Sequence, residues 1–242
     1  MTRGGTMATS TVRLLLNDEM ASAIVHGRKT VTRRPVTPNP SQRWWLKSAQ
    51  QITGCPNASM LKHGCGAQFE HPGGGPFTCI DAPCAPGDLL IGRECWAENV
   101  PGCEFQGGVS YRADHSDKRG DGPAHPMKWR PSIHMPDRAA RIRRRVVSVT
   151  VERLQDVTEE DAVREGMQPA PDSDGRFLSP LRHRPNVSAE VHNARQAFRL
   201  AWDAIYAARG LRWNTNPWVW RIEFEGNGQH SVSTHRVQCA IC

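Results

Sequence analysis

The sequence lacks the long apolar segments of a membrane or secreted protein. Among its 242 residues there is no apolar run of 18 or more, the length that a helix needs to cross a bilayer. The apolar stretch in MTRGGTMATSTVRLLL, at the N-terminus, is too short for a signal peptide. We therefore expect a cytoplasmic protein without membrane contact, in which the eight cysteines are reduced.

Internal repeats and a regular alternation of strands and helices are also missing, which argues against a doubly wound parallel sheet. The 21 glycines and 18 prolines favour short elements and long loops over a helix bundle. We therefore expect an α+β fold in which a small mixed or antiparallel β-barrel has helices packed outside it.

Acidic residues are outnumbered, with 24 Asp and Glu against 31 Lys and Arg, a net charge of +7 and a pI near 9.2. A basic surface favours polyanions such as RNA or DNA, although a soluble protein can be basic without binding either. One run can follow an RNA backbone or guard the edge of a strand. It comprises Arg138, Arg141, Arg143, Arg144 and Arg145.

Capping residues and hydrophobic periodicity predict the elements of this fold. Strands are expected at 11–16, 29–34, 89–91, 141–154 and 218–225. In the fourth strand, Val147, Val149 and Val151 alternate with polar residues. Helices are expected from Asn17 to Gly27, from Thr158 to Gly166, and over 191–205 before Gly210.

We expect a single domain over residues 1–242 with long insertions. Its core is expected at 11–34, 86–96, 141–167 and 189–225. The insertions are 35–85, which is expected to be irregular, 97–137, which is rich in loops, and 168–188, which is polar. A mobile tail is expected over 226–242.

Four cysteines gather in the first insertion: Cys55, Cys65, Cys79 and Cys84. Four thiolates can bind a structural zinc ion, although their spacing lacks the tight C-x-x-C pairs of most zinc sites. Free thiols are the alternative, and we interpret the C-x-x-C at 239–242 as incidental because no fold is expected around it.

The segment HGRKTVTRR (26–34) concentrates basic and hydroxyl side chains directly after the first helix. It can serve a phosphate, a base or catalysis, or it can be a charged strand edge. In a regular strand, Lys29 points to the face opposite that of Thr32, so the two side chains meet only if the chain bends between them. Gly27, which ends the helix, allows such a bend.

Four blocks resemble, in order, the signature segments of the ASCH-domain family of the PUA-like superfamily. They are GRKTVTRR (27–34), PGDLLIGRE (86–94), VTVERLQDVTEEDAVREGM (149–167) and VWRIEF (219–224). KWRPSIHMP (128–136) and NPWVW (216–220) resemble the larger ASCH proteins of phages and prophages. The resemblance implies a PUA-like barrel that holds a nucleoside or an RNA base.

The family includes small bacterial amidohydrolases that remove the acetyl group from N4-acetylcytidine with a threonine, a lysine and a glutamate. In this sequence Lys29 follows Gly-Arg, and Thr32 comes three residues later. Glu165 lies in the helix after the long strand, three residues past an alanine and two before a methionine. The resemblance thus implies Thr32 as nucleophile, Lys29 as base and Glu165 as orienting or proton-handling carboxylate, without a metal or cofactor.

The same interpretation offers residues that bind the substrate. Arg28 and Arg34 flank the lysine and the threonine and can supply a cation. Arg93 and Glu94, close to Trp96, can recognise a base, or they can form an internal ion pair beside a core tryptophan.

Two other functions stay open at this point. The protein can be a non-catalytic RNA-binding module that uses the same cleft and the basic run, or an RNA-cleaving ASCH protein. The sequence leaves the acyl-group preference and the oligomeric state undetermined.

Overall fold

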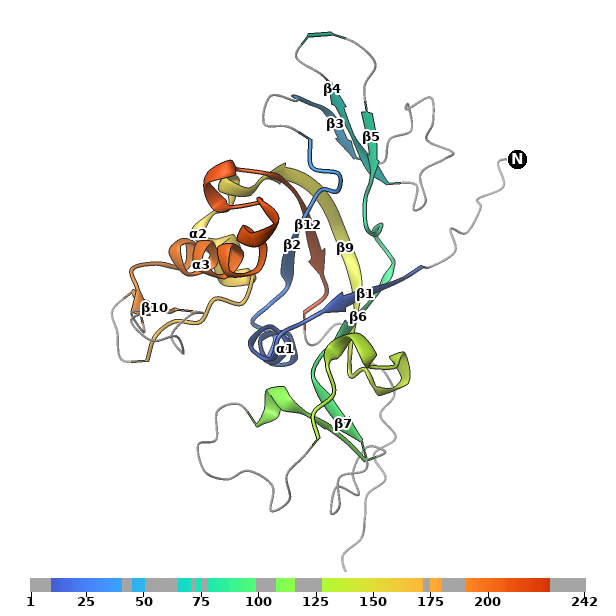
Figure 1. Ribbon diagram of the computed structural model, residues 1–242, viewed down its shortest axis with the longest axis vertical. Helices are drawn as coiled ribbons and strands as arrows, with labels where there is room; N and C mark the ends of the chain where they lie inside the picture. The colour runs from blue at the N-terminus through green and yellow to red at the C-terminus, as the bar shows by residue number, and fades with distance from the viewer. Residues whose placement is uncertain are drawn as a thin grey trace, which may run out of the picture.

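The computed structural model describes most of the elements expected from the sequence, and Figure 1 shows their arrangement. The described residues are 10–40, 45–50 (backbone only), 65–70, 73–74, 78–98, 108–115, 128–171, 175–179 and 190–226. Within these ranges, no helix has the length and apolar character required to span a bilayer.

A five-stranded sheet forms the centre of the molecule, in the order β1-β6-β9-β12-β2. Its strands are β1 (Thr11–Leu15), β2 (Val31–Pro35), β6 (Leu89–Arg93), β9 (Ile142–Arg153) and β12 (Trp218–Phe224). β1 is parallel to β6, and the other pairs are antiparallel. The twelve-residue β9 is shared, because its first part pairs with β6 and its remainder with β12.

This sheet leaves β1 and β2 as its two edge strands. No ladder joins them within the described ranges, so the α+β class is confirmed and the closed barrel is not. The two edges nevertheless border one cavity, described below.

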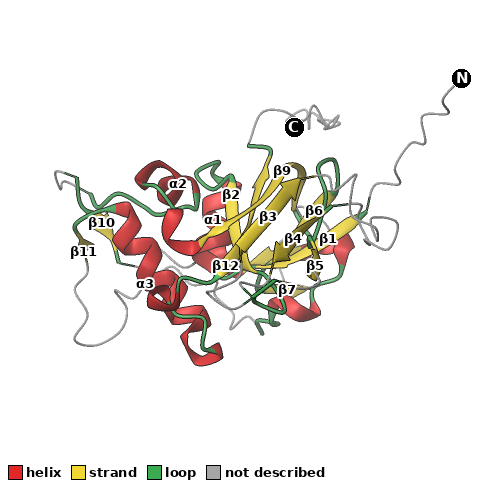
Figure 2. Cartoon of the chain, turned by 90° about the horizontal axis from the view of Figure 1, so that it is seen from above, coloured by secondary structure: helices red, strands yellow, loops and turns green. Residues whose placement is uncertain are grey.

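Three helices pack around the sheet: α1 (Asp18–Val25), α2 (Glu159–Arg164) and α3 (Ala194–Tyr206). α2 and α3 lie together on one side of the sheet, and α1 connects the two edge strands (Figures 1 and 2). Two predicted caps are confirmed: Met20 N donates to Asn17 Oδ1 (2.8 Å) and Asp161 N donates to Thr158 Oγ1 (3.1 Å). Side-chain acceptors satisfy amides that a helix start leaves unpaired, so the sequence fixes where these helices begin.

The expectation of an irregular first insertion was wrong, and the other two insertions also contain short strands. The first contains an antiparallel sheet of β3 (Trp45–Gln50), β4 (Gly66–Glu70) and β5 (Thr78–Asp81). The second contains the pair β7 (Trp96–Glu98) and β8 (Val109–Tyr111), and short 3-10 helices at Arg112–Asp114, Ser132–His134 and Asp137–Ala139. In the third, β10 (Phe177–Leu178) pairs with β11 (Glu190–Val191). These strands are between two and six residues long, so they are too short for their pairing to be visible in local periodicity.

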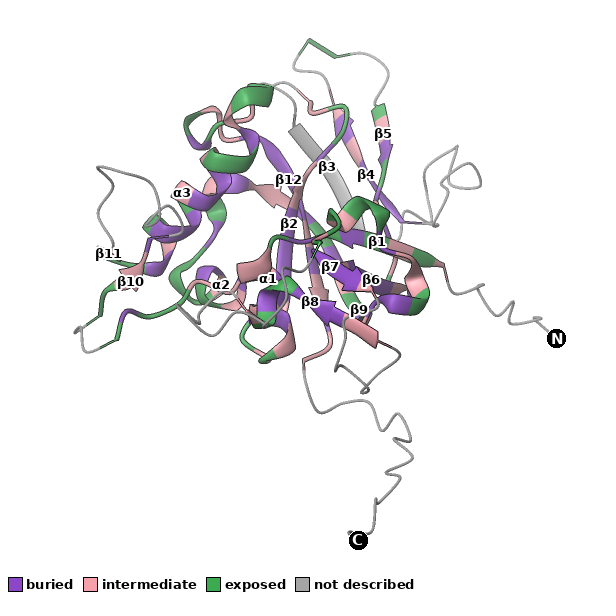
Figure 3. Cartoon of the chain, turned by 60° about the horizontal axis from the view of Figure 1, so that its bottom comes forward, coloured by how far each residue is buried: buried purple, intermediate pink, exposed green. Residues whose placement is uncertain are grey.

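Buried apolar residues, purple in Figure 3, form one cluster between the central sheet, α1 and the strands β4 and β5, and another between β12 and the helices α2 and α3. Trp220 and Ile222 of β12 are buried, as their alternation predicted. Val149 and Val151 are also buried, but Val147 is 51% exposed. The register of β9 and β12 shifts between Glu223 and Phe224, and this irregularity turns Val146 inward in place of Val147.

Candidate functional site

Lys29 and Glu165 form a buried pair where α1 leads into β2. Regular pairing of β2 begins only at Val31, and Lys29 makes an isolated antiparallel bridge with Glu165, the C-cap of α2. Lys29 Nζ donates to Glu165 Oε2 (2.6 Å) and to the Glu165 carbonyl oxygen (2.8 Å). The residues are 1% and 3% exposed, so the contact lies away from bulk water.

The surroundings of Lys29 lower the pKa of its amine. Burial lowers the pKa of this amine, the charge of Glu165 raises it, and the charges of Arg34 and Arg33 lower it further, with a net decrease. Nζ makes two hydrogen bonds, and no third acceptor contacts it among the described residues. A neutral amine has two N–H groups and one lone pair, whereas an ammonium needs three acceptors. Once deprotonated, this amine therefore has a lone pair that no hydrogen bond among the described residues occupies.

Gly166 makes room for the lysine at the end of α2. Its φ of +96° is a left-handed conformation that favours glycine. A Cβ at this position would lie 2.9 Å from Ala23 Cβ and 3.2 Å from Lys29 Cβ. The glycine that ends α2 therefore also permits the close approach of Lys29 to Glu165.

Arg33 holds the other oxygen of Glu165. Its guanidinium is fully buried and contacts three carboxylates: Glu152 Oε1 (2.6 Å), Asp161 Oδ2 (2.5 Å) and Glu165 Oε1 (3.2 Å). The network continues through ion pairs of Arg221, Arg164 and Glu223. Charge-assisted bonds on both oxygens fix the orientation of the Glu165 carboxylate.

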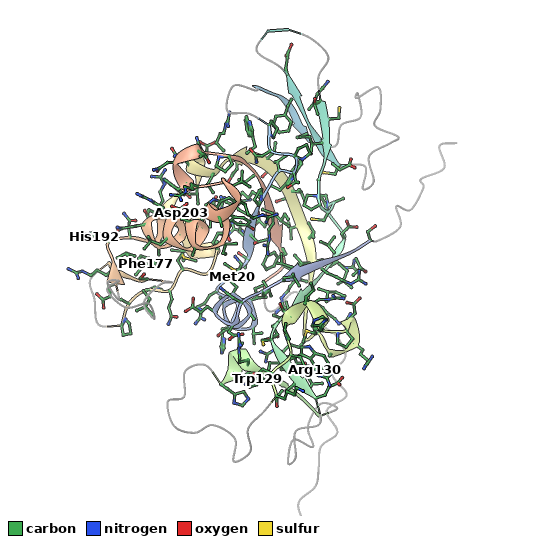
Figure 4. All side chains as sticks on the ribbon, viewed as in Figure 1. Met20, Trp129, Arg130, Phe177, His192 and Asp203 are labelled. Carbon is green, nitrogen blue, oxygen red and sulfur yellow. The ribbon has the colours of Figure 1, made fainter. Side chains whose placement is uncertain are left out.

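A cavity of about 340 Å³ opens beside this pair, at the seam between the two edge strands. Its polar lining includes Thr32 and Arg34 of β2 and Glu165 of α2. The remaining lining is mainly apolar and comes from the end of β1 (Leu15, Leu16), from Met20 on α1 (labelled in Figure 4) and from α3 (Phe198, Ala201, Trp202, Ile205, Tyr206). An apolar pocket with a few converging polar groups is the usual form of a small-molecule site.

Thr32 and Glu165 both line the cavity, and Lys29 is hydrogen-bonded to Glu165. Thr32, Arg33 and Arg34 of β2 all border the cavity. The side chains of Thr32 and Arg33 leave opposite faces of the strand, because neighbouring residues of a strand alternate. Within the described residues, no hydrogen bond joins Thr32 Oγ1 to Lys29 Nζ. Contacts of this kind often tighten only when the substrate is bound.

The predicted substrate-binding residues are distributed unevenly. Arg34 lines the cavity, whereas Arg28 is exposed and is not part of the lining. Arg93 points to another region, where it contacts Asp137 (2.9 Å). Glu94 is completely buried and receives two hydrogen bonds of 2.9 Å from Arg141. The structure therefore does not bring Arg93 and Glu94 to the cavity, and the alternative of internal ion pairs describes them.

The aromatic wall of the cavity was not predicted from the sequence. Phe198, Trp202 and Tyr206 follow one another at intervals of four along α3 and all line the cavity. The rings of Trp202 and Tyr206 are 4.3 Å apart between centroids. The i, i+4, i+8 aromatic stripe was the available signal, but core packing produces the same pattern.

The cysteines do not form one metal site in the described part of the chain, which contains no group of three potential ligands. Cys79 is disulfide-bonded, so the expectation of reduced cysteines was wrong for Cys79. Cys79 lies opposite Gln68 in the β4–β5 pair. Cys65, directly before β4, lies on the other face of this sheet, together with Ala67. Cys65 and Cys84 are buried free thiols, and burial raises the pKa of Cys84 to about 12. Cys55 and the C-x-x-C at 239–242 lie outside the described residues.

No protein-family model, curated protein sequence or solved structure gives a significant match to this chain. The case for a function therefore rests on the residues of the site.

Proposed function

We propose that this protein is an amidohydrolase of the ASCH, PUA-like kind that removes the acyl group from N4-acetylcytidine or a related N4-acylated cytidine. The observation that carries the proposal is the buried Lys29, which donates two hydrogen bonds to Glu165 beside the cavity and whose pKa is lowered by burial. Such an amine is a general base at the edge of a cavity that also presents a hydroxyl group.

In the proposed reaction, Thr32 Oγ1 attacks the acyl carbon and its proton passes to Lys29 Nζ. The bond between the acyl carbon and N4 then breaks, and N4 takes the proton from Nζ to leave as the amine of cytidine. Water hydrolyses the acyl-threonine ester to a carboxylic acid and regenerates Thr32. Glu165 holds Nζ in position throughout, because its second oxygen is fixed by Arg33.

The cavity is suited in size and lining to a pyrimidine nucleoside. Its volume of about 340 Å³ lies within the range of small-molecule sites. Trp202 and Tyr206 offer a wall against which a flat base can stack. No bound metal is needed for the acyl transfer as written.

The test is the release of cytidine from N4-acetylcytidine by the purified protein, followed by chromatography. We expect release by the wild type and by Thr150→Ala, a matched control at an exposed threonine of β9. Thr32→Ala should lose activity by a factor of about 10³ or more. Release that persists in Thr32→Ala would reject the nucleophile, and no release by the wild type from acetyl or longer acyl substrates would reject the activity.

A second candidate, RNA binding without catalysis, is favoured by part of the basic run. Arg138 is 80% exposed, and Arg143 and Arg145 are exposed on β9. Arg141, in contrast, is engaged by Glu94 and Asp114. RNA affinity that falls steeply with salt and depends on the exposed arginines would support this function, and new RNA ends would instead indicate RNA cleavage.

A further inference from the structure

Asn17 presents an unused amide group at the cavity. It is an exposed residue between β1 and α1, and it belongs to the cavity lining. Its Oδ1 accepts the hydrogen bond from Met20 N (2.8 Å) that caps α1. Only the oxygen of a carboxamide can accept a hydrogen bond, so this contact identifies the other atom as Nδ2. Nδ2 carries two N–H groups, and neither has a partner among the described residues.

The helix cap holds this amide in a fixed orientation. Oδ1 and Nδ2 are bonded to the same carbon, so a side chain whose oxygen is held at the helix start has its nitrogen held on the opposite side. A donor that is already oriented loses little entropy when it binds a ligand. The start of α1 does not favour an anion, because Asp18 and Glu19 lie in its first turn. The ligand atom that suits Nδ2 is therefore an uncharged acceptor.

The other side-chain N–H donors of the lining are largely used. Arg33 directs Nε and both terminal nitrogens at carboxylates. Trp202 Nε1 donates to a backbone carbonyl oxygen (2.7 Å). Arg34 directs both terminal nitrogens at protein acceptors and keeps its charged Nε–H without a partner in the described part of the chain. Asn17 thus supplies the lining with a neutral donor that is free to recognise a ligand.

An N4-acylated cytosine offers matching acceptors. N3 and O2 are neighbouring uncharged acceptors on its Watson–Crick edge, next to the N4 atom that carries the acyl group. Thr32 borders the cavity from β2, and Asn17 borders it from the end of β1, across the seam between the two edge strands. A base that directs N4 at Thr32 can therefore turn N3 and O2 toward Asn17. Uracil carries a hydrogen on N3, and adenine lacks the oxygen, so neither base offers this pair of acceptors.

We propose that Asn17 Nδ2 recognises the cytosine ring by donating hydrogen bonds to O2 and N3, and that Asn17 thereby determines the base specificity of the site. The inference rests on the function proposed above. In that reaction Asn17 binds the part of the substrate that does not react. Removal of its donor should therefore weaken binding and raise KM, with little change in kcat.

The experiment replaces Asn17 without removing the helix cap. Asn17→Asp and Asn17→Ser both keep an oxygen for Met20 N, and aspartate and serine are as good at this position as asparagine. Asn17→Asp exchanges the amide donor for an acceptor, whereas Asn17→Ser, which is neutral, controls for the added charge. Asn193→Asp is the matched control, because Asn193 Oδ1 caps α3 in the same way (2.8 Å to Gln196 N) outside the cavity lining.

Calorimetry measures the affinities for cytidine and uridine, and steady-state kinetics measures KM and kcat for N4-acetylcytidine. We expect Asn17→Asp to lower the cytidine affinity and to raise KM about 10- to 100-fold, and Asn17→Ser to do so about 3- to 10-fold. The uridine affinity should fall less in Asn17→Asp, because a carboxylate accepts the N3–H group of uracil. Asn193→Asp should leave the affinities and KM unchanged, and thermal unfolding should be similar for all variants, since each keeps its cap.

The outcomes separate this role from the proposed function. Unchanged cytidine affinity and KM in both Asn17 variants would overturn the role and leave the reaction in place. An equal loss of affinity for cytidine and uridine would also overturn it, because a cap with a purely structural role would affect both nucleosides alike. Asn17-dependent binding of cytidine without hydrolysis of any N4-acylcytidine would reject the proposed reaction and support the role. Neither binding nor hydrolysis by the wild type would reject both.

Discussion

Two buried acid–base clusters in this protein differ in one property. We call them the lysine cluster (Lys29, Arg33, Glu165) and the Glu94 cluster (Glu94, Arg141, Asp114). In each, a carboxylate that is nearly or fully buried is held by a cation at hydrogen-bond distance. Of the two, the lysine cluster combines a neighbouring cavity with a cation whose pKa is lowered by burial and by neighbouring arginines.

In the Glu94 cluster, by contrast, all four carboxylate oxygens accept hydrogen bonds from one arginine. Arg141 donates to both oxygens of Glu94 and to both oxygens of Asp114, and its guanidinium stacks 4.0 Å from the Tyr111 ring. Arginine stays protonated at any pH that a protein experiences, so this arrangement cannot pass on a proton. A buried charge alone therefore does not identify a functional site. Such a site also needs a partner that can exchange a proton and a neighbouring cavity.

Removal of the base should give the largest effect. Lys29→Met should lower kcat/KM for N4-acetylcytidine about 10²- to 10⁴-fold, since it deletes the group that accepts the Thr32 proton. The fold should persist because Glu165 keeps Arg33. Steady-state kinetics and circular dichroism measure the two effects, with Lys128→Met, at an exposed lysine, as control. A folded Lys29→Met variant with full activity would refute the role of the lysine.

The same substitution in the Glu94 cluster should affect stability instead of activity. Arg141→Met leaves the carboxylate of Glu94 buried without its cation, which should cost about 3–5 kcal/mol of unfolding free energy in urea titrations. The double variant Glu94→Leu/Arg141→Met, with an apolar pair, should recover most of this loss. A variant that is stable but inactive would place the Glu94 cluster in the reaction, contrary to the comparison.

The pH dependence of activity should be set by the lysine cluster and not by the Glu94 cluster. Lys29 acts as a base only when neutral, so kcat/KM should be full above its folded pKa and fall about tenfold per pH unit below it. Because burial and neighbouring arginines lower that pKa, the limb should lie below 10.5, the value of a free lysine. Glu94→Gln should leave the limb in place. A limb at or above 10.5, or one that moves in Glu94→Gln, would contradict the assignment.

The smallest expected effect concerns the glycine beside the lysine. Gly166→Ala forces an alanine into a left-handed conformation, at about 1–2 kcal/mol, and also presses on Ala23 and Lys29. Gly175→Ala has a similar φ of +72° but no atom within 4 Å of the new Cβ, so it controls for the backbone cost. Thermal unfolding and kcat should show a larger loss in Gly166→Ala. Equal losses would mean that the contact with Lys29 is unimportant.

Local chemistry made much of the fold predictable from the sequence. The caps at Asn17 and Thr158 and the left-handed glycines Gly27 and Gly166 depend on neighbours within four residues, and all lie where expected. The strand β12 could likewise be predicted, because apolar residues that face the core alternate along it.

The remainder depended on contacts between distant segments. The β3–β5 sheet needs pairing across long loops, and the inward turn of Val146 needs the register shift opposite Phe224. The placement of Glu94 depended on Arg141, 47 residues away. In the candidate site, the residue types were predictable, whereas the aromatic wall and the free Nε of Arg34 appear only when β1, β2 and α3 meet.

The seam between β1 and β2 also bears on how the chain avoids self-association. Edge strands expose backbone groups that can recruit a strand from another copy and start aggregation. Here the guanidinium of Arg34 occupies the Leu15 carbonyl oxygen of β1, and Arg13 adds a half-exposed charge to the same strand. Arg34 of β2 therefore covers a backbone acceptor at the open edge of β1, which leaves this acceptor less available to a strand of another copy.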